Sequence, residues 1–451
     1  MSSVLAHKFL FYAADFLRGD RSVGKLKQLN RSQYWDKNVL RKWRIDKLNI
    51  ILNHARKNSS FYKKRLEDIK LPIKDEKFFQ DIPILTKKNI NSNIDEIKCE
   101  NVPAARFVKA NTGGSTGEPL HFFCDRISLG WRRAAMLRNG SWAGLRLGGR
   151  NAQMTGSHYE YTKRQKTIGK LKLWLLNSKN MPIAFLTEQI LGNYYKQIVS
   201  WKPESVWGYA SGVYQLAKFI KKNHPGACFN FVKAIITSSE TLQEYQRELL
   251  NDVFGKDKVF DHYGAAEFYI AAECPLHNGY HVNSDIFHLE ISDSNGMQKK
   301  PGELGKIVIT DFNNFAFPLI RYEIGDAGFM AVENYCRCGI KLPLLGKVEG
   351  RVADMVILPN RVLTAPNFTN IFRAFKGIDQ YQIVQKSISN IEVIIVKNEL
   401  YNGEFEEHIK KSLNILLGEG VNFSLSYVAQ IEVPKSGKRR FVVSKVAKDN
   451  L

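Results

Sequence analysis

The chain has 451 residues, of which 44% are hydrophobic and 12% aromatic, so it encodes a globular protein and not a disordered or fibrous one. Lys and Arg together number 66 against 44 Asp and Glu, and the net charge of +22 favours anionic partners such as nucleotides, acidic glycans or anionic lipids. We find no recognised nucleic-acid-binding motif and expect no nucleic acid as a partner. Six cysteines do not suggest a disulfide scaffold in so long a chain, and we expect a cytoplasmic location.

The first twenty residues are apolar and aromatic, but Lys8 and Asp15 interrupt them. No small-residue cleavage site follows, so we do not interpret them as a signal peptide, and no apolar run reaches the roughly 18 residues of a membrane helix. Two interpretations remain open: a helix docked on the protein surface, or a helix lying on a membrane. The second would place the protein peripherally at the inner membrane face.

Further along, the periodicity predicts first helices and then an α/β arrangement. Leu48, Ile51, Leu52 and Ala55 fall on one face of a predicted helix. The middle third then alternates strand-like runs, turns and helices, which is the rhythm of an α/β protein. The strand-like runs are WKPESVWGYAS (201–211), KAIITSSE (233–240) and DVFGKDKVFDHYGAAE (252–267).

The last third predicts strands first and then a separate module. Strands are expected at 286–292 and 306–312, and helices and strands mix over the last hundred residues. We therefore expect a large N-terminal α/β domain with a β subdomain over residues 1–349. A small, mobile α+β C-terminal domain is expected over residues 350–451.

A glycine-rich stretch, NTGGSTGEP at 111–119, could cradle a phosphate, because glycines let backbone N–H groups approach an anion closely. No GK[ST] closes it, so it is not a Walker A motif, and alone it fits a surface turn equally well. Four further motifs follow in order along the chain. They are DHYGAAE (261–267), RYEIGD (321–326), GRVAD (350–354) and PKSGKRR (434–440).

As an ordered set, these motifs resemble those of the adenylate-forming enzyme superfamily of acyl-CoA synthetases, adenylation domains and luciferases. Within it, WGYAS, TSSETL and PLIRYEIGDAG are most similar to the phenylacetate-CoA ligase branch, and most of all to CapK-type capsular polysaccharide biosynthesis proteins. The resemblance implies the adenylate-forming fold. It also implies an ATP-dependent ligase that converts a carboxylic acid to an acyl-adenylate, releases pyrophosphate and transfers the acyl group to an acceptor.

The resemblance also assigns roles to individual residues. Lys438 would be a mobile catalytic cation that reaches the carboxylate and the α-phosphate, and Glu267 would help to hold Mg²⁺. Tyr263 would lie against adenine, Asp326 would accept hydrogen bonds from the ribose hydroxyls, and Arg351 would contact ribose or phosphate. The remaining nucleotide-binding positions would be Thr112, Gly113, Gly114, Ser115, Thr116, Gly117, Ser239, Glu240 and Gly264.

The resemblance is ambiguous at Ser239 and Glu240, and the sequence departs from the family pattern at Ala353. Ser239 and Glu240 would flank the adenine, but a helix N-cap with an acidic first turn explains them nearly as well. Ala353 stands where the family's hinge position is commonly acidic, which puts the usual rotation of the small domain in doubt.

The acid-binding pocket would be lined by Trp207, Tyr209 and Ala265, with Ala266, His158 and Tyr159 as further candidates. The acceptor could be coenzyme A, or an amine or hydroxyl of a glycan. Three functions therefore stay open: a ligase of capsular or surface polysaccharide synthesis, a metabolic aryl- or acyl-CoA ligase, and a non-catalytic scaffold that binds anionic polymers. The acid itself and the oligomeric state are not determined by the sequence.

Four Cys and His residues suggest a structural zinc site. Cys336 and Cys338 form a Cys-x-Cys pair, and Cys274 with one of His277 or His281 would complete a tetrahedral N/S set. The resemblance favours His281. Buried thiols without a metal are the alternative interpretation, and this is our interpretation of Cys124 and Cys228.

Overall fold

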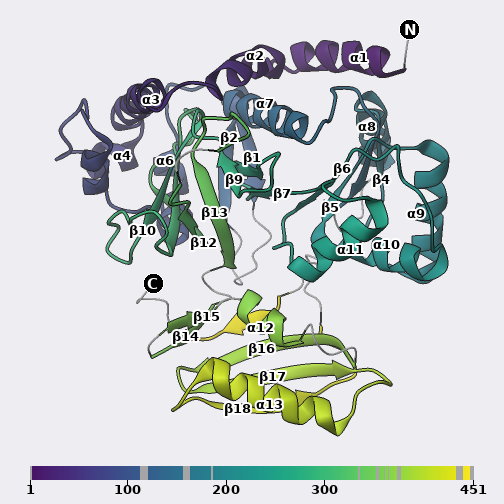
Figure 1. Ribbon diagram of the computed structural model, residues 1–451. Coiled ribbons are helices and arrows are strands. Elements are labelled where there is room, and N and C mark those ends of the chain that lie inside the picture. The colour runs from purple at the N-terminus through teal and green to yellow at the C-terminus, as the bar shows by residue number, and fades with distance from the viewer. Residues whose placement is uncertain are drawn as a thin grey trace.

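The computed structural model describes residues 3–111, 120–155, 163–183, 186–333, 336–351, 355–359, 361–363, 365–372, 377–432 and 440–446. It shows a large mixed α/β body and a smaller C-terminal α+β domain, which confirms the predicted fold class (Figure 1). The division between residues 349 and 350 stays a prediction, and strand β13 (Leu344–Arg351) runs across it. Among the described residues, no helix has the length and apolarity needed to cross a bilayer.

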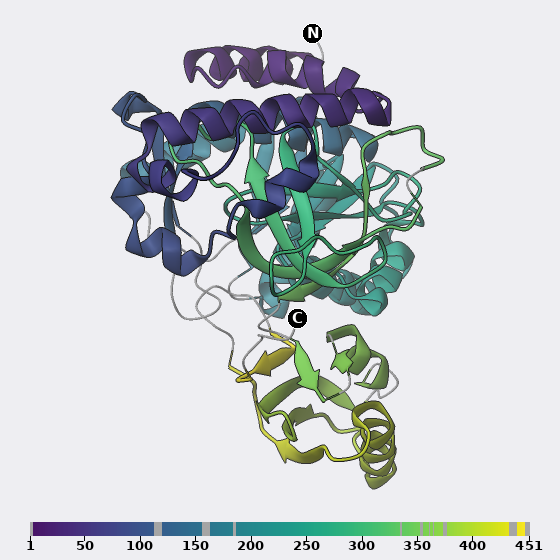
Figure 2. The ribbon, with the colours of Figure 1, turned by 90° about the vertical axis from the view of Figure 1, so that its left-hand side faces the viewer.

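Helices form an N-terminal layer over one side of the large body (Figure 2). Helix α3 (Lys37–Asn58) begins after Asp36, whose carboxylate accepts hydrogen bonds from the first-turn N–H groups of Asn38 and Val39. The predicted apolar face of α3 is confirmed, because its four members are fully buried. The neighbouring helices are α1 (Ser3–Leu17), α2 (Ser22–Ser32), α4 (Ser60–Arg65), α5 (Lys87–Ser92) and α6 (Ile94–Ile97), with 3₁₀ turns at Glu76–Asp81 and Ala104–Arg106.

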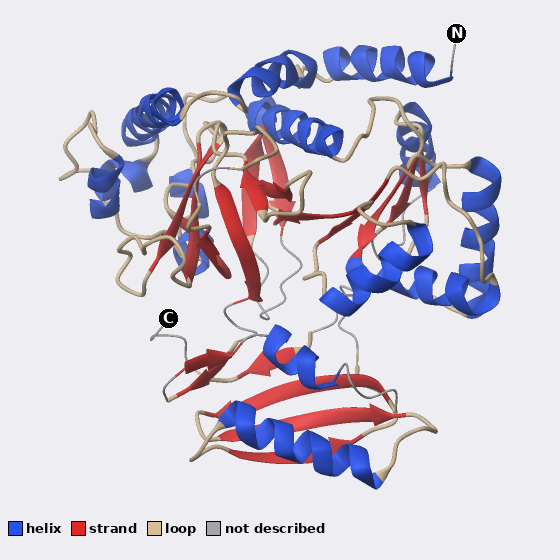
Figure 3. Cartoon of the chain, in the orientation of Figure 1, coloured by secondary structure: helices blue, strands red, loops and turns tan. Residues whose placement is uncertain are grey.

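In the described part of the chain, eleven strands form one sheet, in the order β10-β11-β12-β13-β9-β8-β7-β6-β5-β3-β4. Figure 3 shows the strands of the large body in red with helices around them. The strands from β4 to β7 in this order pair in parallel. The pairs from β7 to β10 are all antiparallel. Parallel neighbours need crossover connections, which helices supply between β3 and β7. Strand β7 is therefore the strand at which the sheet changes from parallel to antiparallel pairing.

The predicted strands at 286–292 and 306–312 are confirmed as β10 and β11. The strands of the sheet are β3 (Asn151–Met154), β4 (Ser178–Asn180), β5 (Ser205–Tyr209), β6 (Ala234–Ser238), β7 (Val259–Gly264), β8 (Tyr269–Glu273), β9 (Tyr280–Val282), β10 (Phe287–Ser292), β11 (Gly305–Asp311), β12 (Tyr322–Met330) and β13. The helices of this part are α7 (Arg126–Trp142), α8 (Lys163–Leu175), α9 (Glu188–Trp201), α10 (Ala210–Asn223) and α11 (Glu244–Phe254), and β1 (Phe107–Asn111) pairs with β2 (His121–Asp125).

The C-terminal domain packs two helices on a small sheet with its own apolar core, as the periodicity of the last hundred residues predicts. Its strand order is β18-β17-β16-β19. The elements are β14 (Val356–Leu358), β15 (Arg361–Leu363), α12 (Ala365–Phe372), β16 (Ile378–Ser387), β17 (Asn390–Lys397), α13 (Gly403–Leu417), β18 (Asn422–Tyr427) and β19 (Val442–Ser444).

Candidate functional site

The predicted site begins at the carboxyl ends of the parallel strands β5, β6 and β7, inside the large sheet. Tyr209 pairs with Ser238, and Ser238 pairs in turn with His262. The carboxyl ends of the three strands therefore lie side by side, which brings Tyr209, Ser239 and Tyr263 to one edge. In open α/β sheets, ligands bind in the crevice outside the carboxyl ends of the parallel strands, and β5, β6 and β7 end together here.

Tyr263 and Asp326 come together from distant parts of the chain. The phenol of Tyr263 donates a hydrogen bond to Asp326 Oδ2 at 2.8 Å. Three strands separate β7 from β12 in the sheet order, so the two strands would lie about 19 Å apart in a flat sheet. Their contact therefore shows that the sheet curls on itself. Asp326 also pairs with Arg351 across β12 and β13, so three predicted nucleotide-site positions are neighbours.

Glu267 is held in the same place by a residue that sequence reasoning missed. Tyr322 donates its phenolic hydrogen to Glu267 Oε1 at 3.0 Å, and both side chains are buried. Tyr322 and Asp326 both belong to β12, which brings the two contacts into one strand, although its register against β11 shifts between Glu323 and Ala327. The signal was present in RYEIGD, where Tyr322, Ile324 and Asp326 alternate along the strand.

Gly264 allows the sharp turn that carries Ala265 and Glu267. A Cβ on Gly264 would lie 2.9 Å from the carbonyl oxygen of Phe268, closer than Cβ atoms approach an oxygen. The Ala265 N–H donates to that same carbonyl at 2.8 Å, and the β7–β8 register shifts at Gly264. Glycine is therefore required here by close packing.

The predicted acid-pocket residue Trp207 contacts a histidine that sequence reasoning missed. The Trp207 ring lies edge-on to the His262 ring, with centroids 5.2 Å apart, and its indole N–H donates to Ser238 Oγ at 3.3 Å. Burial lowers the pKa of His262 to about 3, so its imidazole is neutral at pH 7. The further candidates His158 and Tyr159 lie outside the described residues.

The helix-cap interpretation of Ser239 and Glu240 is wrong for the helix that follows them. That helix, α11, begins at Glu244 and has Gln243 as its cap. Instead, Glu240 Oε2 accepts a hydrogen bond from the backbone N–H of Ser211, in the first turn of α10, at 2.8 Å. A negative charge is favourable there because a helix N-terminus is partially positive.

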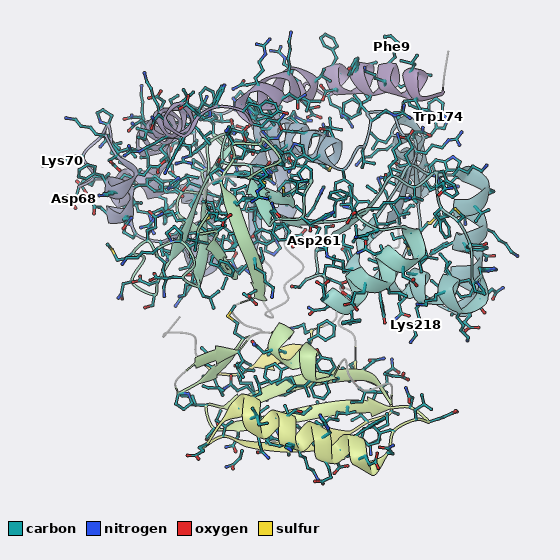
Figure 4. The ribbon with its side chains drawn as sticks, viewed as in Figure 1. Phe9, Asp68, Lys70, Trp174, Lys218 and Asp261 are labelled. Carbon is teal, nitrogen blue, oxygen red and sulfur yellow. The ribbon has the colours of Figure 1, made fainter. Side chains whose placement is uncertain are left out.

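A buried polar network lies behind Tyr263 and was also missed. The Asp261 carboxylate accepts hydrogen bonds from Thr237 Oγ1 at 2.5 Å and from the Tyr280 phenol at 2.8 Å, and Glu273 accepts one from the Asp261 N–H at 2.7 Å. Arg247 pairs with Glu273 at 3.0 Å. Burial raises the pKa of Asp261 to about 6. Figure 4 places Asp261 in the middle of the large body, where the network fixes β7 against its neighbours.

The four predicted zinc ligands converge. The Sγ atoms of Cys274, Cys336 and Cys338 and a ring nitrogen of His281 all lie within 4.8 Å of one another. The His281 Nδ1–H donates to the carbonyl of Leu342 at 3.0 Å, which turns Nε2 toward Cys338 Sγ at 3.1 Å. Such an outer hydrogen bond is typical of a metal-binding histidine. The neighbouring His277 instead contacts Glu273 at 2.9 Å.

The surroundings of the cluster fit zinc. Burial lowers the pKa of His281 to about 4, so the imidazole is neutral, as a metal ligand must be. Three thiols and one imidazole suit a closed tetrahedral zinc site. The cluster lies at the Leu344 end of β13, because Leu344 pairs with His281, whereas Arg351 is at the other end, about 23 Å along the strand. Zinc here would therefore act on the fold and not on the reacting groups.

Several predicted residues lie outside the described part of the chain, namely Thr112, Gly113, Gly114, Ser115, Thr116, Gly117, Ala353 and Lys438. Their roles stay predictions. The interpretation of Cys228 as a core residue is wrong, because its side chain is exposed, whereas Cys124 is buried as predicted.

Comparison with known proteins gives related sequences and folds. A family model described as the CapK C-terminal domain matches residues 359–445. Protein CapK of Staphylococcus aureus is 24% identical over 418 residues, covering 87% of each chain. Phenylacetate-coenzyme A ligase of Thermus thermophilus is 22% identical and covers 82% of this chain and 83% of its own.

Solved structures with a similar fold include 2-hydroxyisobutyryl-CoA ligase in the postadenylation state with R3-HIB-AMP. It has a TM-score of 0.72 and 17% identity, and covers 91% of each chain. The anthranilate CoA ligase bound to anthranoyl-AMP has a TM-score of 0.52 and 14% identity, over 73% of this chain and 65% of its own.

Proposed function

Because this chain has the adenylate-forming fold and a CapK-type C-terminal domain, we propose that it is an ATP-dependent ligase that activates a carboxylic acid as an acyl-adenylate. One observation carries the proposal: the sheet curls so that Tyr263, Asp326 and the Glu267–Tyr322 pair meet at one edge.

The proposed reaction joins two anions. A carboxylate oxygen of the acid attacks the α-phosphorus of ATP, the bond from that phosphorus to the oxygen bridging to the β-phosphate breaks, and pyrophosphate leaves. Asp326 would orient the ribose, with its Oδ2 fixed by Tyr263, and the Tyr263 ring would cover adenine. The acid would bind beside Trp207, Tyr209 and Ala265.

Mg²⁺ fits beside Glu267, because hard cations prefer carboxylate and phosphate oxygens. The hydrogen bond from Tyr322 holds Oε1 of Glu267, which would leave Oε2 to contact the ion. Bound Mg²⁺ would neutralise charge on the leaving pyrophosphate.

Exchange of radiolabelled pyrophosphate into ATP, measured with a panel of carboxylic acids, tests the proposal directly. We expect acid-dependent exchange with at least one acid. Exchange with none of the acids would contradict the proposed ligase activity and favour the non-catalytic scaffold.

Replacing Asp326 by asparagine should raise the KM for ATP by roughly tenfold to a hundredfold, because charge-assisted hydrogen bonds to the ribose contribute about 1.5–3 kcal/mol. Tyr263→Phe is the matched comparison: it would keep the ring against adenine and removes the hydrogen bond to Asp326, so we expect the KM for ATP to rise roughly fivefold. Steady-state exchange kinetics measure both. An unchanged KM for ATP in Asp326→Asn would show that Asp326 does not bind the nucleotide.

We further propose that the acyl group passes to an acceptor used in capsular or surface polysaccharide synthesis, which the similarity to protein CapK supports. Coenzyme A is the second candidate acceptor, supported by the similarity to phenylacetate-coenzyme A ligase. AMP release that depends on added coenzyme A would identify the metabolic ligase. Acid-dependent pyrophosphate exchange with no coenzyme A-dependent AMP release would favour direct transfer to a glycan amine or hydroxyl.

A further inference from the structure

Helix α1 is fastened to the large body along one side only. Asp15 is buried and accepts hydrogen bonds from Ser22 Oγ and, at 3.2 Å, from the Val23 N–H at the start of α2. Arg133 of α7 pairs with both Asp15 and Asp20. Phe11 is buried on the same side. These contacts hold α1 in a fixed orientation.

The opposite side of α1 is apolar and exposed. Leu5, Phe9, Ala13 and Phe16 are all exposed and recur at intervals of four, four and three residues, so they share one face of the helix. Phe9 is 62%, Phe16 79% and Leu17 83% exposed. Figure 4 shows Phe9 on the outer side of α1. A continuous apolar face of this kind on a surface marks an interaction site.

Helix α8 lies beside the attached side of α1 and adds a second group of exposed apolar and basic side chains. Its Trp174 is 58% exposed and lies beside α1, where its ring meets the His7 ring edge-on with centroids 5.7 Å apart. Leu171 is exposed one turn earlier. The α8 sequence, KRQKTIGKLKLWL, carries five Lys or Arg residues and no acidic one, and Lys170 and Lys172 are exposed next to Leu171.

Helix α2 adds only positive charge to the same side of the molecule. Arg21, just before α2, and Lys27 and Arg31 within it are exposed. The acidic residues between positions 3 and 32 are Asp15 and Asp20, and both are buried and paired with arginine. Among the side chains of α1, α2 and α8 that the structure describes, the exposed charged groups are therefore all positive.

We propose that this N-terminal face, formed by α1, α2 and α8, docks the protein on an anionic lipid bilayer. Helix α1, about 22 Å long, would lie in the plane of the interface, with Phe9 and Phe16 among the headgroups and acyl chains. Lys27 and Arg31 of α2 and Lys170 and Lys172 of α8 would contact anionic headgroups. A second copy of the chain fits this face less well, because pairing would oppose like charges.

The proposed orientation leaves the rest of the molecule accessible. Figures 1 and 2 show α1 and α2 on the side of the large body that faces away from the C-terminal domain. A docked protein would therefore present the C-terminal domain and the proposed nucleotide site, at Tyr263 and Asp326, to the aqueous side. The inference does not depend on which acid or acceptor the protein uses.

Co-sedimentation of the full chain with vesicles tests the proposal. We expect binding to vesicles of phosphatidylcholine and phosphatidylglycerol, weak binding to phosphatidylcholine alone, and loss of binding at high salt. The double variant Phe9→Ser/Phe16→Ser should bind at least about tenfold more weakly, because each ring loses its apolar contact with the bilayer. Lys170→Gln/Lys172→Gln should bind roughly thirtyfold more weakly.

Matched controls lie far from this face. Leu400→Ser/Ile415→Ser removes two apolar side chains of similar exposure from the C-terminal domain, and Lys218→Gln/Lys411→Gln removes two exposed charges elsewhere. Both controls should bind as wild type does, and circular dichroism should show every variant folded. Equal binding to both vesicle types, or unchanged binding by both test variants, would overturn the proposal. So would a dimer in light scattering that Phe9→Ser/Phe16→Ser dissociates, which would assign the face to a second copy.

Discussion

Lys438→Ala is expected to slow acyl-adenylate formation by about a hundredfold to a thousandfold, while acyl transfer from a preformed adenylate stays largely unchanged. The reason is electrostatic: an acid carboxylate and the α-phosphate repel each other, and a single cation at their meeting point offsets that repulsion only in the first step. Lys438 is in the segment just before β19, the edge strand that pairs with β16 of the C-terminal domain. Pyrophosphate exchange measures the first step, and consumption of synthetic adenylate measures the second.

Lys435→Ala is the matched control for Lys438→Ala, because it removes the same charge three residues earlier in the same basic segment. We expect it to keep most of the exchange activity. If it fell as far as Lys438→Ala, general basic charge and not a placed cation would explain the effect. An equal fall of both half-reactions in Lys438→Ala would show that this residue has a different role.

Cys338→Ser is expected to abolish zinc binding and to lower the free energy of unfolding by several kcal/mol. Structural zinc contributes on the order of 10 kcal/mol of apparent binding energy in small domains, which is comparable to the total stability of a typical protein. The site joins the residue after β8, Cys274, and the residue in β9, His281, to the segment that leads into β13. Its loss should therefore loosen β13, the strand whose far end carries Arg351.

Metal analysis of the purified chain should give about one zinc per molecule, and a strong chelator should lower the Tm of the wild type but not of Cys338→Ser. Two controls separate zinc binding from the chemistry of a lone thiol. Cys228→Ser changes an exposed thiol, and Cys99→Ser changes a buried one whose pKa burial raises to about 12. Both should retain zinc. A wild-type chain without zinc, or a Cys338→Ser variant that keeps it, would contradict the assignment.

The choice between His277 and His281 shows where sequence reasoning reached its limit. Both histidines follow Cys274 closely, and the spacing allowed either to complete the ligand set. The pairing of Leu344 with His281 places His281 beside the segment that carries Cys336 and Cys338, whereas His277 is held by Glu273. The strand register therefore determines which histidine joins the cluster, and the spacing of residues along the chain does not predict that register.

Arg321 illustrates the same limit inside a recognised motif. It opens RYEIGD and could have been taken for a nucleotide-binding cation. In the structure it is buried, pairs with Glu290 at 2.9 Å and donates to the carbonyls of Gln80, Ile82 and Gly296. It therefore ties the N-terminal segment to β12 and has a structural role.

The sequence by itself determined the secondary structure of α3, β10 and β11, the fold class, and the identity of Tyr263, Glu267, Asp326 and the cysteines as candidates. The elements follow from short-range periodicity, which backbone geometry imposes on any helix or strand; the cysteines follow from their ligand chemistry, and Tyr263, Glu267 and Asp326 from the resemblance of the ordered motifs. Only the tertiary structure showed the Tyr263–Asp326 and Tyr322–Glu267 contacts, the attachment of Glu240 to α10, and the outward apolar face of α1. Each depends on sheet curl, register or helix packing between segments far apart in the chain, and no local pattern encodes those.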